Sequence, residues 1–280
     1  MIPLDNDVLA RLESWARGTD FGHHHLTGGL TMAHYVCHGG EAYGHHVDGL
    51  GGSPNHLFAL AADLTFLVWV NDHIEACGPT NAAAGSSAVT RTGLTFADHV
   101  ARLSTALGGT RFPECERAWW DSTLHDACVA DHAALVYGRT WSYSEYLDNG
   151  IDSINIPHVM ATISSLWGFG IARRRADPLV AGVIRHLGIQ QRLSNDLASI
   201  TKERRSEDPG NAALLMERYM SPVQAAQFIA EEQQGHHRML TRLLNGLSSS
   251  DPLARAAMAI AGGLEGAQRD LQRYKSDCSP

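Results

Sequence analysis

Apolar residues recur at intervals of three and four along most of this 280-residue chain, and the alternation typical of a half-buried strand is nearly absent. Such spacing places apolar side chains on one face of an α-helix. Ser221 and Asp251 each precede a proline, which is a common helix start. The pattern predicts an all-α fold with helices over residues 55–78, 95–108, 113–139, 155–174, 178–203, 211–220, 222–247 and 252–276.

The size and composition of the chain indicate one domain with one core. With 280 residues, of which 44% are hydrophobic, the chain can bury a large apolar interior, and no linker divides it. We therefore expect a single domain over residues 1–280. Residues 1–54 are rich in histidine and glycine, and we expect them to form an irregular N-terminal segment.

Charge and cysteine content exclude several classes of function. Acidic residues outnumber basic ones by 30 to 22, so the chain lacks the basic surface that nucleic acids or anionic membranes require. The five cysteines are widely spaced and form no C-x-x-C pair, which indicates reduced thiols in the cytoplasm. We find no export signal and no apolar run of about 18 residues, so we expect neither secretion nor a membrane span.

The stretch SNDLASITKER, residues 194–204, carries three oxygen-bearing side chains four residues apart. Each helical residue advances about 100° around the axis, so residues four apart differ by only about 40°, and Asn195, Ser199 and Glu203 share one face. Amide, hydroxyl and carboxylate oxygens suit Mg²⁺, and the absence of sulfur or imidazole argues against zinc. Lys202 can reach an anion held by such a metal. Taken alone, the stretch would also fit a solvated polar stripe.

Four motifs resemble those of class I terpene synthases, in particular the bacterial cyclases. NDLASITKE resembles their ND-x-x-S-x-x-x-E metal-binding motif, and FLVWVNDHIE, residues 66–75, resembles the aspartate-rich motif of the facing helix. Residues 210–226 resemble the helix start that follows the metal motif. Arg273 and Tyr274 resemble the pair that closes over the diphosphate. The resemblance covers about residues 58–275.

The resemblance implies a helical bundle with a central active-site cavity and a diphosphate-releasing reaction. In that family, three Mg²⁺ ions and basic residues hold the diphosphate of a prenyl substrate and trigger its ionisation to a carbocation. Homodimers are frequent there, so a homodimer is expected here. Carried over to this sequence, the metal ligands would be Asn71, Asp72, Glu75, Asn195, Ser199 and Glu203, and the diphosphate would contact Lys202, Arg273 and Tyr274.

The upstream motif departs from the family pattern at its first position. Asn71 stands where the family usually has aspartate, and an amide oxygen ligates Mg²⁺ without supplying charge. Asn71 and Glu75 share a helical face, whereas Asp72 points about 100° away. We expect Asp72 and Glu75 to take over ligation, since the alternatives are a weaker site or a larger share carried by the diphosphate.

A second departure concerns the arginine that senses the diphosphate in bacterial members. Forty-six residues before Asn195, this chain has Asn149. The missing cation has three candidate replacements, between which the sequence does not decide: Arg139, Arg192 and Arg204.

The segment after Asn149 resembles the family's linker and effector region, and we expect it to be catalytic together with Asn149. It comprises Asp152, Ser153 and Ile154. Gly150 and Pro157 interrupt helix formation on either side, so a break is expected there. Backbone carbonyls freed by such a break can face a developing cation.

The substrate expected from the resemblance is a prenyl diphosphate. Chain length and the missing arginine favour a C20 substrate, in particular a bicyclic labdane or copalyl-type diphosphate, with farnesyl diphosphate as the alternative. The product would be a cyclised, rearranged or water-quenched carbocation. Aromatic rings can stabilise such cations but are more often core residues, and the candidates are Phe58, Phe66, Trp69, Trp141, Tyr143, Tyr146, Trp167 and Phe169.

Three other functions are weaker fits to the sequence. A prenyl-elongating enzyme would need a second aspartate-rich motif, and a non-catalytic prenyl-diphosphate-binding protein is suggested only by Asn71 and Asn149. A histidine-based metal protein lacks a His-Glu-x-x-His run, and glycines crowd its candidate ligands. These candidates are His23, His24, His25, His34, His38, Glu41, His45 and His46.

Overall fold

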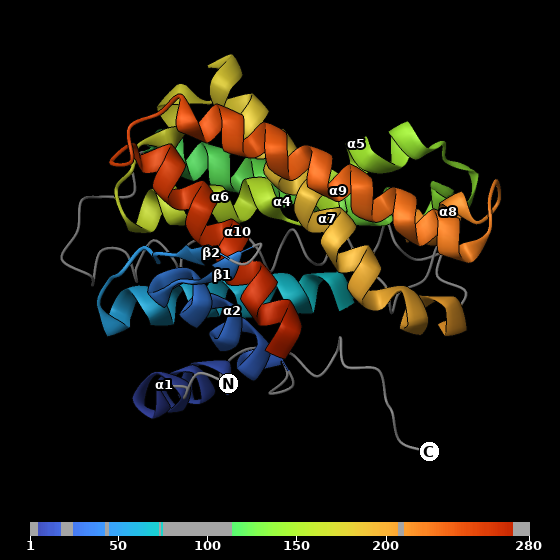
Figure 1. Cartoon of the computed structure of the whole chain (residues 1–280). Coiled ribbons are helices and arrows are strands. Elements are labelled where there is room, and N and C mark those ends of the chain that lie inside the picture. Colours follow the sequence, from blue (N-terminus) through green and yellow to red (C-terminus); the bar gives the residue numbers. More distant parts are fainter. Residues whose placement is uncertain are drawn as a thin grey trace.

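The computed structural model describes residues 5–17, 25–42, 45–72, 74, 114–206 and 210–270 (Figure 1). It confirms the all-α prediction, and the segment predicted over 95–108 lies outside the described residues. No helix of the described ranges is long and apolar enough to cross a membrane. The helices are α1 (Asn6–Ala16), α2 (Leu26–His38), one over residues 54–72, α4 (Glu114–Tyr137), α5 (Tyr143–Ser153), α6 (Ile156–Leu166), α7 (Pro178–Ser206), α8 (Ala212–Met216), α9 (Pro222–Asn245) and α10 (Pro252–Asp270).

The N-terminal region differs from the irregular segment expected over residues 1–54. Asp5 caps α1 by accepting hydrogen bonds from the backbone N–H groups of Asp7 (3.0 Å) and Val8 (3.1 Å). Val8, Leu12 and Ala16, four residues apart, are buried on one face of α1. An antiparallel hairpin of β1 (Gly40–Ala42) and β2 (His45–Val47) follows α2. The N-terminal part of the chain therefore contains helices with ordinary apolar spacing, which its histidine and glycine content made hard to recognise in the sequence.

Helix α5 was absent from the predicted helices although its start has a clear sequence motif. Ser142 and Glu145 form a capping box, in which Ser142 Oγ accepts from the Glu145 N–H and the Glu145 carboxylate accepts from the Ser142 N–H (2.8 Å). The predicted start signals at the other end of the chain are confirmed. Ser221 caps α9, and α10 begins at Pro252, directly after Asp251.

Helix α7 occupies the centre of the bundle and carries the predicted metal motif. It packs against α5, α6, α8, α9 and α10, and Figure 1 shows α9 running alongside it. Leu187 and Leu193 on α7 are fully buried. α10 in turn packs against α2 and the hairpin, so the C-terminal and N-terminal parts of the described chain meet beside α7.

A buried polar network fixes the 54–72 helix against α4 and α6. Asp63 accepts a hydrogen bond from Thr162 Oγ1 (2.7 Å), and its other oxygen lies 3.2 Å from His158 Nε2. Trp120 Nε1 donates to Thr162 Oγ1 (2.9 Å). Because buried polar groups are costly unless paired, these contacts hold one relative placement of the three helices. They thereby position Asn71, two turns further along the same helix.

Candidate active site

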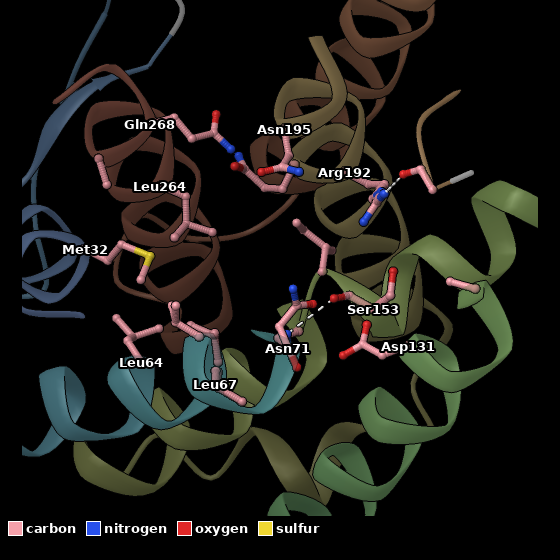
Figure 2. Close-up of a pocket in the computed structure, with 18 of the residues that line it drawn as sticks. Met32, Leu64, Leu67, Asn71, Asp131, Ser153, Arg192, Asn195, Leu264 and Gln268 are labelled. Atoms are coloured by element: carbon pink, nitrogen blue, oxygen red, sulfur yellow. Dashed lines mark hydrogen bonds between the residues drawn. The ribbon is translucent and has the colours of Figure 1, made fainter. Parts of the chain in front are cut away.

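A cavity of about 200 Å³ lies between the 54–72 helix, α4, the junction of α5 and α6, α7 and α10 (Figure 2). One part of its wall is aliphatic and the other is polar. The aliphatic part includes Met32, Leu64, Leu67, Leu135 and Leu264. The polar part, much of it on α7, consists of Asn71, Asp131, Ser153, Asn155, Gln191, Arg192, Asn195, Lys202, Glu203 and Gln268.

Most of the predicted α7 motif reaches this cavity. Asn195, Lys202 and Glu203 line it, as their helical spacing predicts. Ser199 is buried on the same helix, and its hydroxyl donates to the backbone carbonyl of Asn195 (2.8 Å). Ser199 thus retains its oxygen lone pairs beside Asn195, although it is not among the lining residues.

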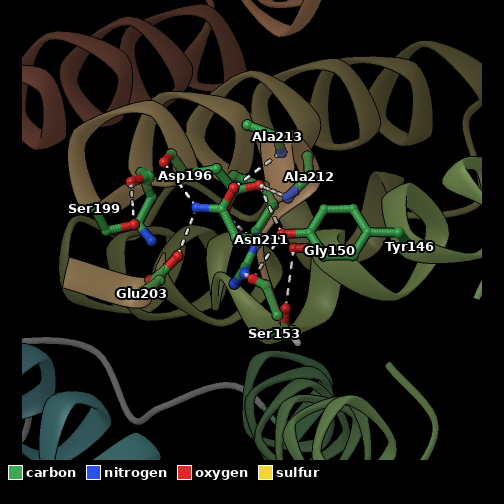
Figure 3. Close-up of polar contacts among 12 residues, drawn as sticks. Tyr146, Gly150, Ser153, Asp196, Ser199, Glu203, Asn211, Ala212 and Ala213 are labelled. Carbon is green, nitrogen blue, oxygen red and sulfur yellow. Dashed lines mark hydrogen bonds and ion pairs between the residues drawn. The ribbon is translucent and has the colours of Figure 1, made fainter. Parts of the chain in front are cut away.

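Asn211 lies in the 210–226 stretch but was not predicted as a site residue, yet it links the metal motif to the start of α8 (Figure 3). Its Nδ2 donates to Glu203 Oε2 (2.6 Å) and to the backbone carbonyl of Asp196 (2.8 Å). Its Oδ1 accepts from the N–H groups of Ala213 (2.9 Å) and Leu214 (3.3 Å), which caps α8. Asn211 is fully buried, so its amide is saturated and holds one oxygen of the Glu203 carboxylate.

The upstream motif divides between the cavity and a neighbouring helix. Asn71 lines the cavity, whereas Asp72 does not and instead lies 3.6 Å from His25 Nδ1 at the start of α2. This arrangement follows from the turn of about 100° between adjacent helical residues. Glu75 lies outside the described residues, as do Arg273 and Tyr274. The expectation that Asp72 replaces Asn71 as a ligand thus has no support from its placement.

The structure distinguishes between the three candidate arginines. Asn149 donates through Nδ2 to the Ala130 carbonyl on α4 (3.1 Å) and is not a lining residue. Arg204 forms an exposed ion pair with Glu217, and the side chain of Arg139 is outside the described part of the structure. Arg192 lines the cavity one turn before Asn195. Arg192 is therefore the described candidate whose charge faces the polar wall.

A rigid set of acceptors orients the Arg192 guanidinium. Nε donates to the Tyr146 hydroxyl (2.6 Å) and pairs with Asp196 Oδ1 (3.1 Å), while Nη2 donates to the Gly210 carbonyl. Within the described residues, Nη1 has no hydrogen-bond partner, and 15% of the side-chain surface stays exposed. A Cβ on Gly150 would lie 3.0 Å from Arg192 Cγ, so this glycine permits the close approach of α5 and α7.

Burial dominates the electrostatics beneath Arg192. Desolvation raises the pKa of Asp196 to about 6, although the Arg192 charge and the Tyr146 hydrogen bond (2.6 Å) oppose that shift. The Arg192 pKa is raised above its usual range by the neighbouring Asp196, so the guanidinium stays charged at all relevant pH values. The network therefore presents a fixed positive charge to the cavity.

The predicted helix break is present between α5 and α6. α5 ends at Ser153 and α6 begins at Ile156, and Ser153 and Ile154 line the cavity at the junction. Asn155 adopts a left-handed conformation (φ 61°), which lets the chain change direction. Asp152 is not a lining residue; burial and the nearby Asp126 raise the pKa of its carboxyl.

The aromatic candidates are core residues or partly buried side chains that pack against the core. No aromatic residue is among the described residues that line the cavity. Phe66 stacks on Trp69 with ring centroids 6.0 Å apart, and Phe58 meets Trp15 edge to face at 6.5 Å. Tyr146 serves the cavity only through its hydroxyl, as a contact of Arg192. Packing at helical spacing explains these side chains.

The donor set of the cavity fits a hard cation better than zinc. Amide oxygens of Asn71 and Asn195 and the Glu203 carboxylate face the same space, and the described lining includes neither histidine nor cysteine. The rings of His34 and His38 lie next to each other on α2 at an angle of 45°, with centroids 4.4 Å apart. The described residues contain no cluster of three His, Cys, Asp or Glu side chains that would hold a metal.

Comparisons with known proteins agree with this geometry. The family model described as "Terpene synthase family 2, C-terminal metal binding" matches residues 61–234. Germacradien-4-ol synthase from Streptomyces citricolor is 16% identical with a TM-score of 0.69, over 94% of this chain and 93% of that one. Linalool/nerolidol synthase from Streptomyces clavuligerus, in complex with 2-fluorogeranyl diphosphate, is 16% identical with a TM-score of 0.72, over 95% and 94%. 2-Methylisoborneol synthase from Streptomyces coelicolor A3(2) is 16% identical with a TM-score of 0.68, over 94% of this chain and 88% of that one.

Proposed function

Because the chain belongs to terpene synthase family 2, we propose that this terpene synthase uses Mg²⁺ to ionise a prenyl diphosphate inside the cavity described above. One observation carries the proposal. Asn71 from the 54–72 helix and Asn195, Glu203 and Arg192 from α7 converge on the polar wall of a single cavity whose other wall is aliphatic. A substrate with a charged head and a hydrocarbon tail matches such a wall.

The polar wall would hold the diphosphate end of the substrate. Asn71, Asn195 and Glu203 are the described residues that would bind Mg²⁺, with Ser199 beside them, and the ion would supply Lewis-acid stabilisation of the departing diphosphate. Arg192 Nη1 and Lys202 add positive charge at the same wall. Preorganised charges of this kind stabilise negative charge as it develops on a leaving group.

The aliphatic wall would hold the prenyl chain and exclude bulk water. Leu64, Leu67, Leu135 and Leu264 offer no group that reacts with a carbocation. Their burial of the hydrocarbon contributes binding energy away from the reacting carbon, which positions the allylic C–O bond at the polar wall.

The comparisons favour a substrate with a shorter prenyl chain than the C20 diphosphate suggested by the sequence. The length of the protein does not distinguish diterpene from smaller terpene synthases, because this chain covers 93% of germacradien-4-ol synthase. A linalool/nerolidol synthase of similar fold, at a TM-score of 0.72, was solved in complex with 2-fluorogeranyl diphosphate. We therefore place geranyl and farnesyl diphosphates first and the C20 diphosphates second.

A substrate panel tests the proposal. Purified protein is incubated with Mg²⁺ and separately with geranyl, farnesyl, geranylgeranyl and copalyl-type diphosphates, and both pyrophosphate release and organic products are measured. We expect Mg²⁺-dependent release that EDTA removes and that Glu203→Gln lacks. Binding of these diphosphates without any turnover would refute the proposal in favour of a non-catalytic binding protein.

A further inference from the structure

Two amide side chains in the cavity wall have buried atoms without a hydrogen-bond partner among the described residues. Gln191 is fully buried, and within the described residues neither its Nε2 nor its Oε1 has a partner. The Oδ1 of Asn155 is also buried and unpaired there, although its Nδ2 donates to the Ser153 carbonyl (3.3 Å). Both residues line the cavity. Because an unmade buried hydrogen bond costs about 1–3 kcal/mol, these groups indicate a polar ligand.

The two residues lie beside the reacting end of the cavity. Gln191 is four residues before Asn195 and shares its face of α7, one turn further from Glu203. Asn155 lies in the break between α5 and α6, and it is the one described non-glycine residue with positive φ. The part of a prenyl chain next to the diphosphate would therefore pass between these amides.

The hydrocarbon tail has no group that could satisfy an amide. The diphosphate would be held by the positive charge of Arg192, which points about 100° away from Gln191 around α7, and by the metal ligands that begin one turn further along at Asn195. A water molecule bound between these amides would accept from Gln191 Nε2 and donate to Asn155 Oδ1. Buried waters typically make two to four such bonds, which leaves one lone pair for chemistry.

We propose that Gln191 and Asn155 hold the water molecule that captures the carbocation, so that this enzyme forms a terpene alcohol. The inference rests on the proposed function. A lone pair of the water oxygen forms a C–O bond to the cationic carbon, and the resulting oxonium ion loses a proton to an oxygen of the released diphosphate. The products are an alcohol and protonated diphosphate, and no oxidant or reductant takes part.

The composition of the described wall agrees with early capture. A carbocation that undergoes many rearrangements is stabilised by aromatic faces along its path. None of the described lining residues is aromatic, whereas two unpaired amides are present. Capture by a held water then competes well with further rearrangement.

Gln190 provides a matched control for Gln191. It is also fully buried with both amide atoms unpaired in the described structure, but it does not line the cavity. Gln191→Leu and Gln190→Leu therefore remove the same group from adjacent positions of α7. Asn155→Gly removes the second amide while keeping the left-handed backbone accessible, because glycine adopts positive φ readily.

The test uses the substrate that gives the fastest pyrophosphate release, in H₂¹⁸O with Mg²⁺. We expect an ¹⁸O-labelled alcohol from the wild type. Gln191→Leu and Asn155→Gly should each lower the ratio of alcohol to hydrocarbon about tenfold, the effect of about 1.4 kcal/mol, and this ratio is read independently of the rate of pyrophosphate release. Gln190→Leu should keep the wild-type ratio, and thermal melting checks the folding of each variant.

The outcomes separate this inference from the proposed function. Mg²⁺-dependent pyrophosphate release with hydrocarbon products alone overturns the water site and leaves the synthase assignment standing. An unchanged alcohol ratio in both Gln191→Leu and Asn155→Gly, or an equal loss in Gln190→Leu, overturns it too. Absence of pyrophosphate release from every substrate refutes the proposed function itself.

Discussion

Replacing Asn211 by serine should weaken Mg²⁺ binding while leaving the fold intact. Serine keeps an oxygen that can cap α8, whereas it removes the N–H groups that donate to Glu203 Oε2 (2.6 Å) and to the Asp196 carbonyl (2.8 Å). The Glu203 carboxylate then loses the contact that fixes its rotamer. Its ordering would have to occur when the metal binds, at a cost to affinity.

The magnitude follows from the contacts that are lost. A hydrogen bond to a charged group contributes about 1.5–3 kcal/mol, and the partial exposure of Glu203 lets water replace part of this, leaving about 1 kcal/mol. That difference corresponds to an apparent Mg²⁺ affinity about fivefold weaker. Asn211→Ala should lose the cap as well, which lowers the free energy of unfolding by about a further 0.5–2 kcal/mol.

The assay is isothermal titration of Mg²⁺ in the presence of inorganic pyrophosphate, which is independent of turnover. A double-mutant cycle with Glu203→Gln separates positioning from general destabilisation, because coupled residues show non-additive losses. If Asn211→Ser weakens Mg²⁺ binding as much in the Glu203→Gln background as in the wild type, Asn211 does not act through that carboxylate and the reasoning is refuted.

Four further outcomes are expected. Glu203→Gln should abolish Mg²⁺-dependent turnover, because a neutral amide cannot replace a charged ligand; near-normal product formation would contradict the assignment. Asn71→Asp should tighten apparent Mg²⁺ affinity by restoring a carboxylate, and an unchanged metal titration would place residue 71 outside the ligand set. Gly150→Ala should weaken pyrophosphate binding several-fold, since overpacking against Arg192 costs about 1–3 kcal/mol. The control is Gly235→Ala, because its added Cβ would meet only the end of the Arg238 side chain, at 3.8 Å. Burial, with the neighbouring His186 and Arg185, lowers the pKa of His236 to about 4. Because histidine in the unfolded chain has a pKa of about 6.5, the unfolded state binds more protons between pH 6.5 and 4, and the free energy of unfolding should fall as the pH drops through that interval. Urea unfolding should show a smaller fall for His236→Gln than for the wild type.

Local patterns accounted for the elements and for one half of the site. Helical spacing predicted α4, α7, α9 and α10 with bounds close to those observed, because each helix buries one continuous stripe. The same regularity put Asn195 and Glu203 on one face, and both line the cavity. Gly150 and Pro157 indicated the break that separates α5 from α6.

Contacts between helices decided the other half, and no local pattern encodes them. Whether Arg139, Arg192 or Arg204 faces the cavity depends on how closely α5 approaches α7 at Gly150. The hydrogen bond between Asn211 and Glu203 joins α7 to the start of α8, and the contact of Asp72 with His25 requires α2 beside the 54–72 helix.

The sequence by itself thus determined a helical bundle and an oxygen-rich metal motif, because helix formation and face sharing depend on residues three and four apart. Only the tertiary structure decided which positive charge, which amides and which aliphatic side chains enclose one cavity. Those choices depend on the packing of helices that brings residues distant in the chain, such as Asn155 and Gln191, to the same cavity.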